Sequence, residues 1–293
     1  MELPNTITIA KNSSHPLQVN RFGYGTMRLT GEGIYGEPPR REEALEILKQ
    51  AIRSEVNFLD TADYYGDDVT NRLIVEALYP YPKDLVICTK VGATRKPDKS
   101  WIPFLTPENL RTAIERNLKT LRLEQISLVH FRVMPGIRFP FEESMQAMFE
   151  MQKEGKILHI GVSNVNPEEL NQALKMGPIA TVENMYGYGQ RTTLKSPYGE
   201  NRGAEEILKI CEENEIPLIP YWTLLNSLPK KEDKIQELAD RLGATEAQIH
   251  LAWLLHKSPW ILPIPGTSQL THFEENMGAK EIRLSERDME YLG

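Results

Sequence analysis

Short apolar runs alternate with amphipathic segments along almost the whole chain, and this alternation restricts the possible folds more than any other feature. In the amphipathic segments the apolar residues recur three or four positions apart, as in the stretch Arg41–Arg53, which is the spacing of a helix with one buried face. Such an order is typical of parallel strands connected by helices. The apolar runs predicted as strands are Val19–Met27, Val56–Leu59, Leu85–Thr89, Ile126–Phe131, Ile157–Val162, Ile179–Val182, Ile216–Pro220 and Ile261–Ile264.

Eight strands that are each followed by a helix predict an α/β fold of the (β/α)8 TIM-barrel type. No linker rich in Pro, Gly or Ser divides the 293 residues, so we expect residues 1–293 to form one barrel domain. The helix boundaries carry the usual capping signals. We predict N-caps at Thr106, Asn166 and Thr245 and C-caps at Gly155 and Gly243.

The composition excludes several classes of protein. Hydrophobic residues make up 40% of the chain and charged residues 26%, and the net charge is −7, which suits a protein with a large core and no field that attracts nucleic acid. No run of 18 apolar residues and no signal peptide is visible, so we expect a cytoplasmic protein without a membrane span. Cys88 and Cys211 each lie in an apolar run and are expected to be buried free thiols.

The glycines Gly31, Gly33 and Gly36 match the spacing of a dinucleotide-binding fingerprint. That fingerprint requires a strand before it and a helix directly after it. Pro38 and Pro39 follow instead, and a helix cannot run from the glycines through this pair. We therefore predict a flexible surface loop near the barrel mouth.

Polar residues stand at the ends of seven of the predicted strands. In a barrel the carboxyl ends of all strands meet on one face, where such enzymes place their chemistry. One polar residue there is usually only the start of a loop, but seven in register favour a functional site. These residues are Asp60, Lys90, His130, Ser163-Asn164, Glu183-Asn184, Tyr221 and Gly266-Thr267-Ser268.

Lys90 is the most informative of these residues because a lysine that closes an apolar strand needs a partner. Asp60 on the neighbouring strand is the natural one, although an Asp-Thr pair can also merely cap a turn. Tyr65 follows Asp60 by five positions, within loop reach of both. A cation beside a tyrosine favours its phenolate, so we predict Tyr65 as a general acid for a carbonyl oxygen. Tyr64 is expected to pack or to face solvent.

These residues resemble the aldo-keto reductase superfamily. The resemblance covers nearly the whole chain in order, and within the superfamily the sequence looks most like bacterial pyridoxal reductases. The motifs that carry it are Asn57–Gly66, Thr89–Gly92, Gly155–Asn164, Ala252–Leu255 and Ile264–Ser268, and the stretches shared with pyridoxal reductases are Tyr79–Pro82, Ser100–Pro103 and Leu128–Met134.

The resemblance implies NADPH as cofactor and a role for each matching residue. The family's catalytic Asp, Tyr and Lys fall on Asp60, Tyr65 and Lys90. Its nicotinamide contacts fall on Ser163, Asn164 and Glu183, and its stacking aromatic falls on Tyr221. Its adenosine and 2′-phosphate contacts fall on Gly266, Thr267, Ser268, His272, Glu275 and Asn276.

The sequence departs from the family pattern at several positions. Glu183 replaces a glutamine and can only accept hydrogen bonds. Gly266 removes a lysine that some members place on the 2′-phosphate, and His272 stands where many have arginine. The family's catalytic histidine is represented either by His130, which has the right chemistry, or by Arg132, which has the aligned position; His130 could also be a structural histidine. No spacing of His, Asp or Glu indicates a metal site.

The sequence thus predicts an NADPH-dependent reductase of a small carbonyl substrate, which could be pyridoxal. Aromatic residues expected around the barrel mouth could hold a flat ring or only pack the loops: Tyr35, Trp101, Tyr186, Tyr188 and Trp222. Few basic residues accompany them, namely Arg28, Arg132 and Arg191, which favours an uncharged aldehyde over a phosphorylated one.

Two alternatives remain open from the sequence. One is a cofactor-binding regulatory subunit of the same fold, like the cytosolic subunits of potassium channels, which turnover on a panel of aldehydes would distinguish. The other is a non-redox barrel with a Schiff base on Lys90, which Asp60 disfavours by keeping the lysine protonated. The sequence leaves the oligomeric state open.

Overall fold

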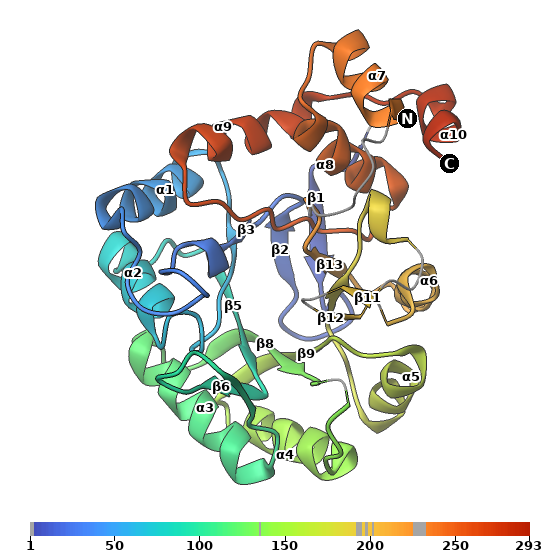
Figure 1. The fold of residues 1–293 in the computed structure, drawn as a ribbon. Coiled ribbons are helices and arrows are strands. Elements are labelled where there is room, and N and C mark those ends of the chain that lie inside the picture. Colours follow the sequence, from blue (N-terminus) through green and yellow to red (C-terminus); the bar gives the residue numbers. More distant parts are fainter. Residues whose placement is uncertain (1–2, 135, 192–194, 197–198, 201, 225–232) are drawn as a thin grey trace.

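The computed structural model describes residues 3–134, 136–191, 195–196, 199–200, 202–224 and 233–293. Its central feature is a parallel sheet of seven strands in the order β13-β10-β9-β8-β5-β4-β3, curled into a barrel (Figure 1). The strands are β3 (Tyr24–Gly25), β4 (Phe58–Asp60), β5 (Val86–Val91), β8 (Ile126–Arg132), β9 (Ile157–Ser163), β10 (Val182–Met185) and β13 (Leu218–Tyr221).

The predicted eighth strand closes this barrel by backbone hydrogen bonds on both sides. The amide of Leu218 in β13 donates to Trp260 O at 2.8 Å, and the amide of Gly23, just before β3, donates to Pro263 O at 2.8 Å. Only one isolated parallel bridge, between Leu218 and Ile261, forms there, because Pro263 and Pro265 have no amide hydrogen to donate. The predicted (β/α)8 barrel is confirmed, with an irregular eighth strand.

Helices surround the sheet and follow its strands in the predicted alternation (Figure 1). The predicted N-caps are confirmed: Thr106, Asn166 and Thr245 each accept a hydrogen bond from the third residue of the helix. The helices are α1 (Arg41–Arg53), α2 (Val69–Leu78), α3 (Pro107–Thr120), α4 (Phe141–Lys153), α5 (Pro167–Met176), α6 (Ala204–Glu213), α7 (Asp233–Leu242), α8 (Glu246–Lys257), α9 (Leu270–Gly278) and α10 (Glu286–Leu292), with short 3-10 turns η1 (Thr26–Arg28), η2 (Tyr188–Gln190) and η3 (Ala279–Glu281).

The N-terminal segment differs from the prediction of one long first strand over Val19–Met27. The chain first forms an antiparallel hairpin of β1 (Thr6–Ile9) and β2 (Leu17–Asn20), and only the short β3 joins the barrel. Ile7, Ile9 and Val19 of the hairpin pack with residues inside the barrel. This burial of apolar side chains stabilises the hairpin, and it explains why an apolar run here is not a barrel strand.

The sixth strand was also misplaced. β10 spans Val182–Met185 rather than Ile179–Val182, because Val182 and Glu183 pair with Val162 and Ser163 of β9. Glu183 therefore lies within the strand and not after it, and its alternation along the strand directs it into the barrel.

The connections that follow the strands cover the barrel mouth. The glycine-rich loop is held by a hydrogen bond from the amide of Gly31 to Gly36 O at 2.9 Å, and its residue Ile34 lines a cavity at the mouth. No helix follows it directly, as predicted. After β5, an antiparallel ribbon of β6 (Ala93–Arg95) and β7 (Trp101–Pro103) brings Trp101 to the same cavity. After β10, a small ribbon forms from β11 (Lys195–Ser196) and β12 (Gly199–Glu200), and residues 192–194, 197–198 and 201 of the predicted long loop lie outside the described part.

Candidate active site

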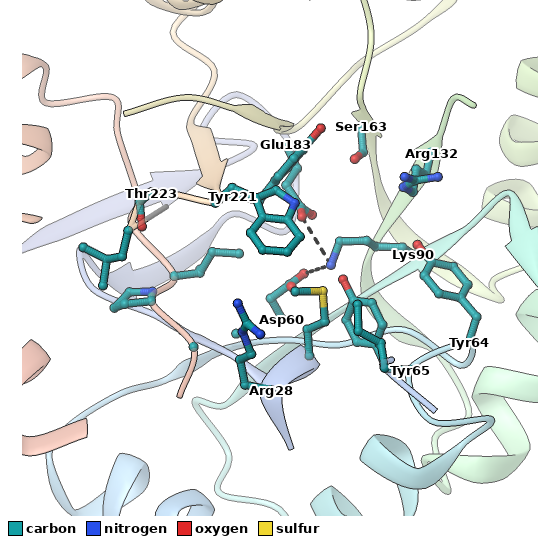
Figure 2. Close-up of a pocket in the computed structure, with 18 of the residues that line it drawn as sticks. Arg28, Asp60, Tyr64, Tyr65, Lys90, Arg132, Ser163, Glu183, Tyr221 and Thr223 are labelled. Carbon is teal, nitrogen blue, oxygen red and sulfur yellow. Dashed lines mark hydrogen bonds and ion pairs between the residues drawn. The ribbon is translucent and has the colours of Figure 1, made fainter. Parts of the chain in front are cut away.

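A cavity of about 430 Å³ opens at the carboxyl ends of the strands, where the sequence predicts the site. Figure 2 shows charged and aromatic side chains from several strands converging on it. The lining includes Arg28, Asp60, Tyr64, Tyr65, Lys90, Trp101, Arg132, Ser163, Glu183, Tyr221, Trp222 and Gly266.

The predicted contact between Lys90 and Asp60 is present. Lys90 Nζ donates a hydrogen bond to Asp60 Oδ1, and both side chains are almost completely buried. Lys90 Nζ also lies 3.3 Å from Glu183 Oε1, a contact that the sequence pattern did not predict. One ammonium is therefore shared by two buried carboxyl groups on β4 and β10.

This arrangement fixes the protonation states. Burial would lower the pKa of Lys90, but attraction to Asp60 and Glu183 outweighs it and raises that pKa. Burial also raises the pKa of Asp60, and the charge of Glu183 adds to this effect. Burial opposes ionisation of Glu183 too, but Lys90 and His130 overcome it and lower its pKa. Lys90 therefore carries a positive charge that the two buried carboxyl groups stabilise.

Tyr65 lies directly beside this cluster. Its ring centroid is 5.1 Å from Lys90 Nζ, and the side chain is buried at the cavity wall. The sequence predicts a lowered pKa for Tyr65 beside Lys90, and this prediction is wrong for the net effect. Burial raises the pKa of Tyr65; Lys90 lowers it as predicted but does not compensate, and Asp60 and Glu183 raise it further. Tyr65 is consequently a fully protonated donor at neutral pH.

Buried polar contacts hold the turn that carries Tyr65 between β4 and α2. Thr61 Oγ1 lies 2.9 Å from Thr70 Oγ1, so the two ends of the turn are joined. Gly66 adopts φ 70°, and a Cβ there would lie 2.7 Å from Val69 Cβ. The turn therefore requires a glycine at this position, and its closure presents Tyr65 to Lys90.

His130 lies one layer below the cavity and does not line it. Its Nδ1 is 3.0 Å from Glu183 Oε2, and its Nε2 is 2.8 Å from Thr181 Oγ1. Its Nδ1 also lies 3.1 Å from Cys88 Sγ. Burial lowers the pKa of His130 despite the neighbouring Glu183, which indicates a neutral ring. A Cβ on Gly161 would lie 2.4 Å from His130 Cδ2, so the glycine makes room for the ring.

Arg132, two residues along β8, does line the cavity. His130 and Arg132 point to the same side of the strand, but His130 is wholly buried whereas Arg132 reaches the open part. A side chain that contacts a substrate must reach the open cavity. Of these two residues of β8, only Arg132 does so, and the structure therefore favours Arg132 over His130.

A group of possible metal ligands lies beneath the cavity. Ligand atoms of Asp60, Cys88 and His130 are within 4.8 Å of one another in the described part of the chain. Asp60 already accepts from Lys90, whose ammonium supplies the positive charge that a metal would bring. Burial also raises the pKa of the Cys88 thiol well above its usual value, which opposes the thiolate that a metal requires. We assign no metal to these residues.

The residues predicted to hold the nicotinamide are only partly on the cavity surface. Ser163 and Tyr221 line it, as does Glu183. Asn164 does not: its Nδ2 donates to Val133 O at 2.9 Å, and its Oδ1 accepts from the hydroxyl of Tyr221 at 3.0 Å. Asn164 thus fixes the orientation of the Tyr221 ring over the cavity.

The residues predicted for the adenosine end follow the eighth strand. Gly266 lines the cavity, and a Cβ there would lie 2.4 Å from Gly25 O. Thr267 Oγ1 caps the amide of Gln269 before α9, and Ser268 is half-buried beside it. On α9 itself, His272 is exposed, Glu275 is half-buried and Asn276 is buried. Glu43 Oε1 accepts from the amide of Leu270 at 3.0 Å, so a carboxylate already occupies one donor at this helix start.

Several cavity residues did not stand out in the sequence. Tyr64 was expected to pack or face solvent; it does pack, with its ring 5.3 Å from that of Tyr65, but it also lines the cavity. Of the aromatic residues expected around the mouth, Trp101 and Trp222 line the cavity. Tyr186 and Tyr188 follow the other alternative and pack against Trp253, and Tyr35 is not part of the described lining. The position of Tyr64 directly before Tyr65 was the only signal in the sequence that could have found it.

Comparison with known proteins shows which family and which solved structures this chain is similar to. The model of the "Aldo/keto reductase family" matches residues 21–293. The chain is 39% identical to pyridoxine 4-dehydrogenase of Escherichia coli K12, with 98% of this chain and 97% of that protein covered. Among solved structures it is similar to a thermostable aldo-keto reductase in complex with the inhibitor epalrestat, with 30% identity, a TM-score of 0.82 and 98% of each chain covered.

A second solved structure has the same fold. It is an aldo/keto reductase from Klebsiella pneumoniae in complex with NADP and acetate, with 24% identity, a TM-score of 0.77 and coverage of 99% of this chain and 94% of that one. Among the described residues, no helix is long and apolar enough to cross a membrane.

Proposed function

The chain belongs to the aldo/keto reductase family of oxidoreductases, and we propose that it uses NADPH to reduce pyridoxal to pyridoxine. The observation that carries the proposal is the buried phenol of Tyr65 beside the ammonium of Lys90 at the wall of an open cavity. The substrate is inferred from the similarity to pyridoxine 4-dehydrogenase along nearly the whole chain.

The residues around the cavity fit a nicotinamide cofactor. Tyr221 offers an aromatic face whose orientation is fixed by Asn164, and Ser163 offers a hydroxyl beside it. Arg28 lies at the rim, with its guanidinium carbon 5.4 Å from the centre of the Trp222 ring. A flat ring can stack on Tyr221, and Arg28 can pair with the cofactor's phosphate groups. When bound, NADPH supplies the hydride that is added to the carbonyl carbon.

The protein's own part in the reaction is to position the carbonyl oxygen and to give it a proton. Tyr65 donates its hydroxyl proton to this oxygen as negative charge develops there. A phenol is a stronger acid than the product alcohol, so this transfer remains favourable although burial raises the pKa of Tyr65. Lys90 stabilises the phenolate that results, and Asp60 and Glu183 hold Lys90 in place.

The same contacts bear on the two alternative functions. A Schiff base would require neutral Lys90, but Asp60 and Glu183 keep the ammonium charged, and this opposes nucleophilic attack. A regulatory subunit would need the cofactor site but no open place for a substrate. The cavity instead extends past Lys90 to Trp101 and Arg132, which favours turnover.

The preference for NADPH over NADH is also a proposal, and it depends on a small number of donors near the start of α9. Gly266 provides no cation for a 2′-phosphate, and His272 is exposed on α9. Glu43 already accepts the amide of Leu270 at the helix start and would repel an anion there. The remaining donors are the hydroxyl groups of Thr267 and Ser268 and the ring of His272.

Pyridoxal is expected to have a kcat/KM at least about tenfold higher than that of pyridoxal phosphate. Arg28 is assigned to the cofactor, so Arg132 remains as the one arginine on the substrate side of the described cavity lining. A phosphate dianion would lose part of its hydration in the cavity, and no second arginine is present on the substrate side of the described lining to compensate for this loss. We expect this to cost about 1–3 kcal/mol of binding free energy. The oxidation of NADPH with each aldehyde is followed by the loss of the absorbance of its reduced nicotinamide. Chromatography identifies pyridoxine as the product.

The control for this prediction is a simple aromatic aldehyde, such as benzaldehyde. Turnover of benzaldehyde without turnover of pyridoxal would reject the proposed substrate while keeping the reductase. A higher kcat/KM for pyridoxal phosphate would show that the cavity accommodates a phosphate.

A further inference from the structure

Two buried polar atoms on one side of the cavity lack a hydrogen-bond partner among the described residues. They are the hydroxyl of Tyr64 and Nη1 of Arg132, and both side chains line the cavity. Tyr64 is only 2% exposed. An unsatisfied buried donor is costly and rare in a native protein, so a ligand that enters the cavity is a natural partner for both atoms.

The positive charge of Arg132 is also uncompensated. Asp60 and Glu183 are both engaged by Lys90, and in the described part of the chain no carboxylate lies within ion-pair distance of Arg132. The guanidinium carbon lies 5.8 Å from the centre of the Trp101 ring, and that ring packs edge-on against Tyr64 at 5.5 Å. The two donors are therefore held by a shared aromatic neighbour and do not extend freely into solvent.

These donors are separate from the end of the cavity assigned to the cofactor. Figure 2 shows Arg132 and Tyr64 on one side of Lys90, and Arg28 and Thr223 on the opposite side. Arg28, which we assign to the cofactor's phosphate groups, thus lies across Lys90 from Arg132. The unsatisfied donors face the part of the cavity that the substrate would occupy.

We propose that Arg132 and Tyr64 form a subsite for an ionised oxygen that the substrate carries next to its carbonyl group. Both groups can donate, and a guanidinium cannot accept, so the ligand atom must be an acceptor and is favoured as an anion. Tyr64 and Tyr65 are adjacent in the chain with rings 5.3 Å apart. An oxygen on the atom beside the carbonyl-bearing carbon would therefore reach this subsite while Tyr65 contacts the carbonyl oxygen.

This inference rests on the proposed reductase function and narrows its substrate class. It selects aldehydes with an ionisable hydroxyl ortho to the formyl group, an arrangement that pyridoxal has. It also separates the two roles: Tyr65 acts on the reacting oxygen, and Arg132 with Tyr64 recognises the second oxygen.

The test compares two aldehydes that differ only in that hydroxyl, 3-hydroxypyridine-4-carbaldehyde and pyridine-4-carbaldehyde. The wild-type enzyme is expected to favour the hydroxylated aldehyde by about 10- to 100-fold in kcat/KM, the range for hydrogen bonds to a charged group. In Arg132→Met this ratio should fall to near one, mainly through a higher KM for the hydroxylated aldehyde. Tyr64→Phe removes a neutral donor and should lower the ratio by about two- to tenfold.

Arg138→Met is the matched control, since Arg138 is exposed and does not line the cavity. Its ratio between the two aldehydes should stay at the wild-type value. A wild-type ratio near one, or a ratio that Arg132→Met leaves unchanged, would overturn the subsite. Thermal unfolding of each variant verifies that it is folded, and Tyr64→Phe loses no hydrogen bond within the described structure.

A binding measurement separates failure of this inference from failure of the proposed function. If the wild type reduces neither aldehyde, the reductase proposal fails, and binding of pyridoxine to the protein is measured by calorimetry. A dissociation constant that rises about tenfold or more in Arg132→Met supports the subsite without any turnover. Equal dissociation constants in the wild type and Arg132→Met overturn it.

Discussion

Tyr65→Phe is expected to lower kcat for pyridoxal by about 10²–10⁴-fold, the usual contribution of a general acid. The variant keeps the ring that packs against Tyr64 at 5.3 Å and faces Lys90 at 5.1 Å, and removes only the hydroxyl. Cofactor affinity should remain close to that of the wild type, because Ser163, Tyr221 and Arg28 are unchanged. A loss in kcat without a loss in cofactor affinity identifies a group that acts in the transition state.

The measurement pairs steady-state kinetics with a fluorescence titration of NADPH. Tyr79→Phe serves as a matched control, since Tyr79 is 50% exposed and does not line the cavity; it should retain wild-type kcat. Wild-type kcat in Tyr65→Phe would remove Tyr65 from the reaction. A loss of NADPH binding parallel to the loss of activity would instead point to a role in the cofactor site.

Lys90→Met is expected to combine a loss of activity of about 10²-fold or more with a shift of the pH profile. Tyr65 acts in its protonated form, so activity falls as the pH rises through its pKa. Lys90 lowers that pKa against the effects of burial, Asp60 and Glu183. Removing the ammonium raises the pKa of Tyr65, and the alkaline limb of kcat should therefore move to higher pH.

The same substitution leaves two buried carboxyl groups without their shared cation. Loss of one member of a buried ion pair costs about 3–5 kcal/mol. This loss should be greatest at high pH and should shrink as the pH falls, because protonated Asp60 and Glu183 require no cation. Denaturant unfolding across the pH range measures it. Lys90→Arg, which keeps the charge, should recover part of the stability. An alkaline limb that does not move would mean that Tyr65 is insensitive to Lys90, and a stability loss independent of pH would contradict the shared-cation arrangement.

The sequence predicted the barrel and the pairing of Lys90 with Asp60 because both depend on short-range patterns. Strands and helices alternate along the chain, and the barrel brings the ends of neighbouring strands β4 and β5 together. Lysine at the end of an apolar strand needs a carboxylate, and Asp60 was the nearest one on an adjacent strand. Cap residues such as Asn166 were predictable for the same reason, since a helix start depends on a few consecutive residues.

Features that depend on depth and on distant strands were not predictable. The contact of Glu183 with Lys90 joins β10 to β5 across the barrel interior. The strand was predicted at Ile179–Val182 instead of Val182–Met185, so Glu183 was expected after the strand and not within it. The net rise in the pKa of Tyr65 follows from burial, which a sequence pattern does not reveal. Tyr186 and Tyr188 are aromatic like the residues that line the cavity, but they pack against Trp253 and do not line it. His130 and Arg132 share a strand face, and only the depth of each side chain separates their positions.

We propose that a hydride passes directly from NADPH to the carbonyl carbon of the substrate in this cavity while Tyr65 supplies the proton. The most direct measurement uses NADPH that carries deuterium at both positions of nicotinamide C4, with pyridoxal as substrate and mass spectrometry of the alcohol. We expect pyridoxine with one deuterium bound to carbon for each NADPH oxidised, and loss of this product in Tyr65→Phe. Oxidation of NADPH that yields no deuterated alcohol, or deuterated alcohol formed at the wild-type rate by Tyr65→Phe, would contradict it.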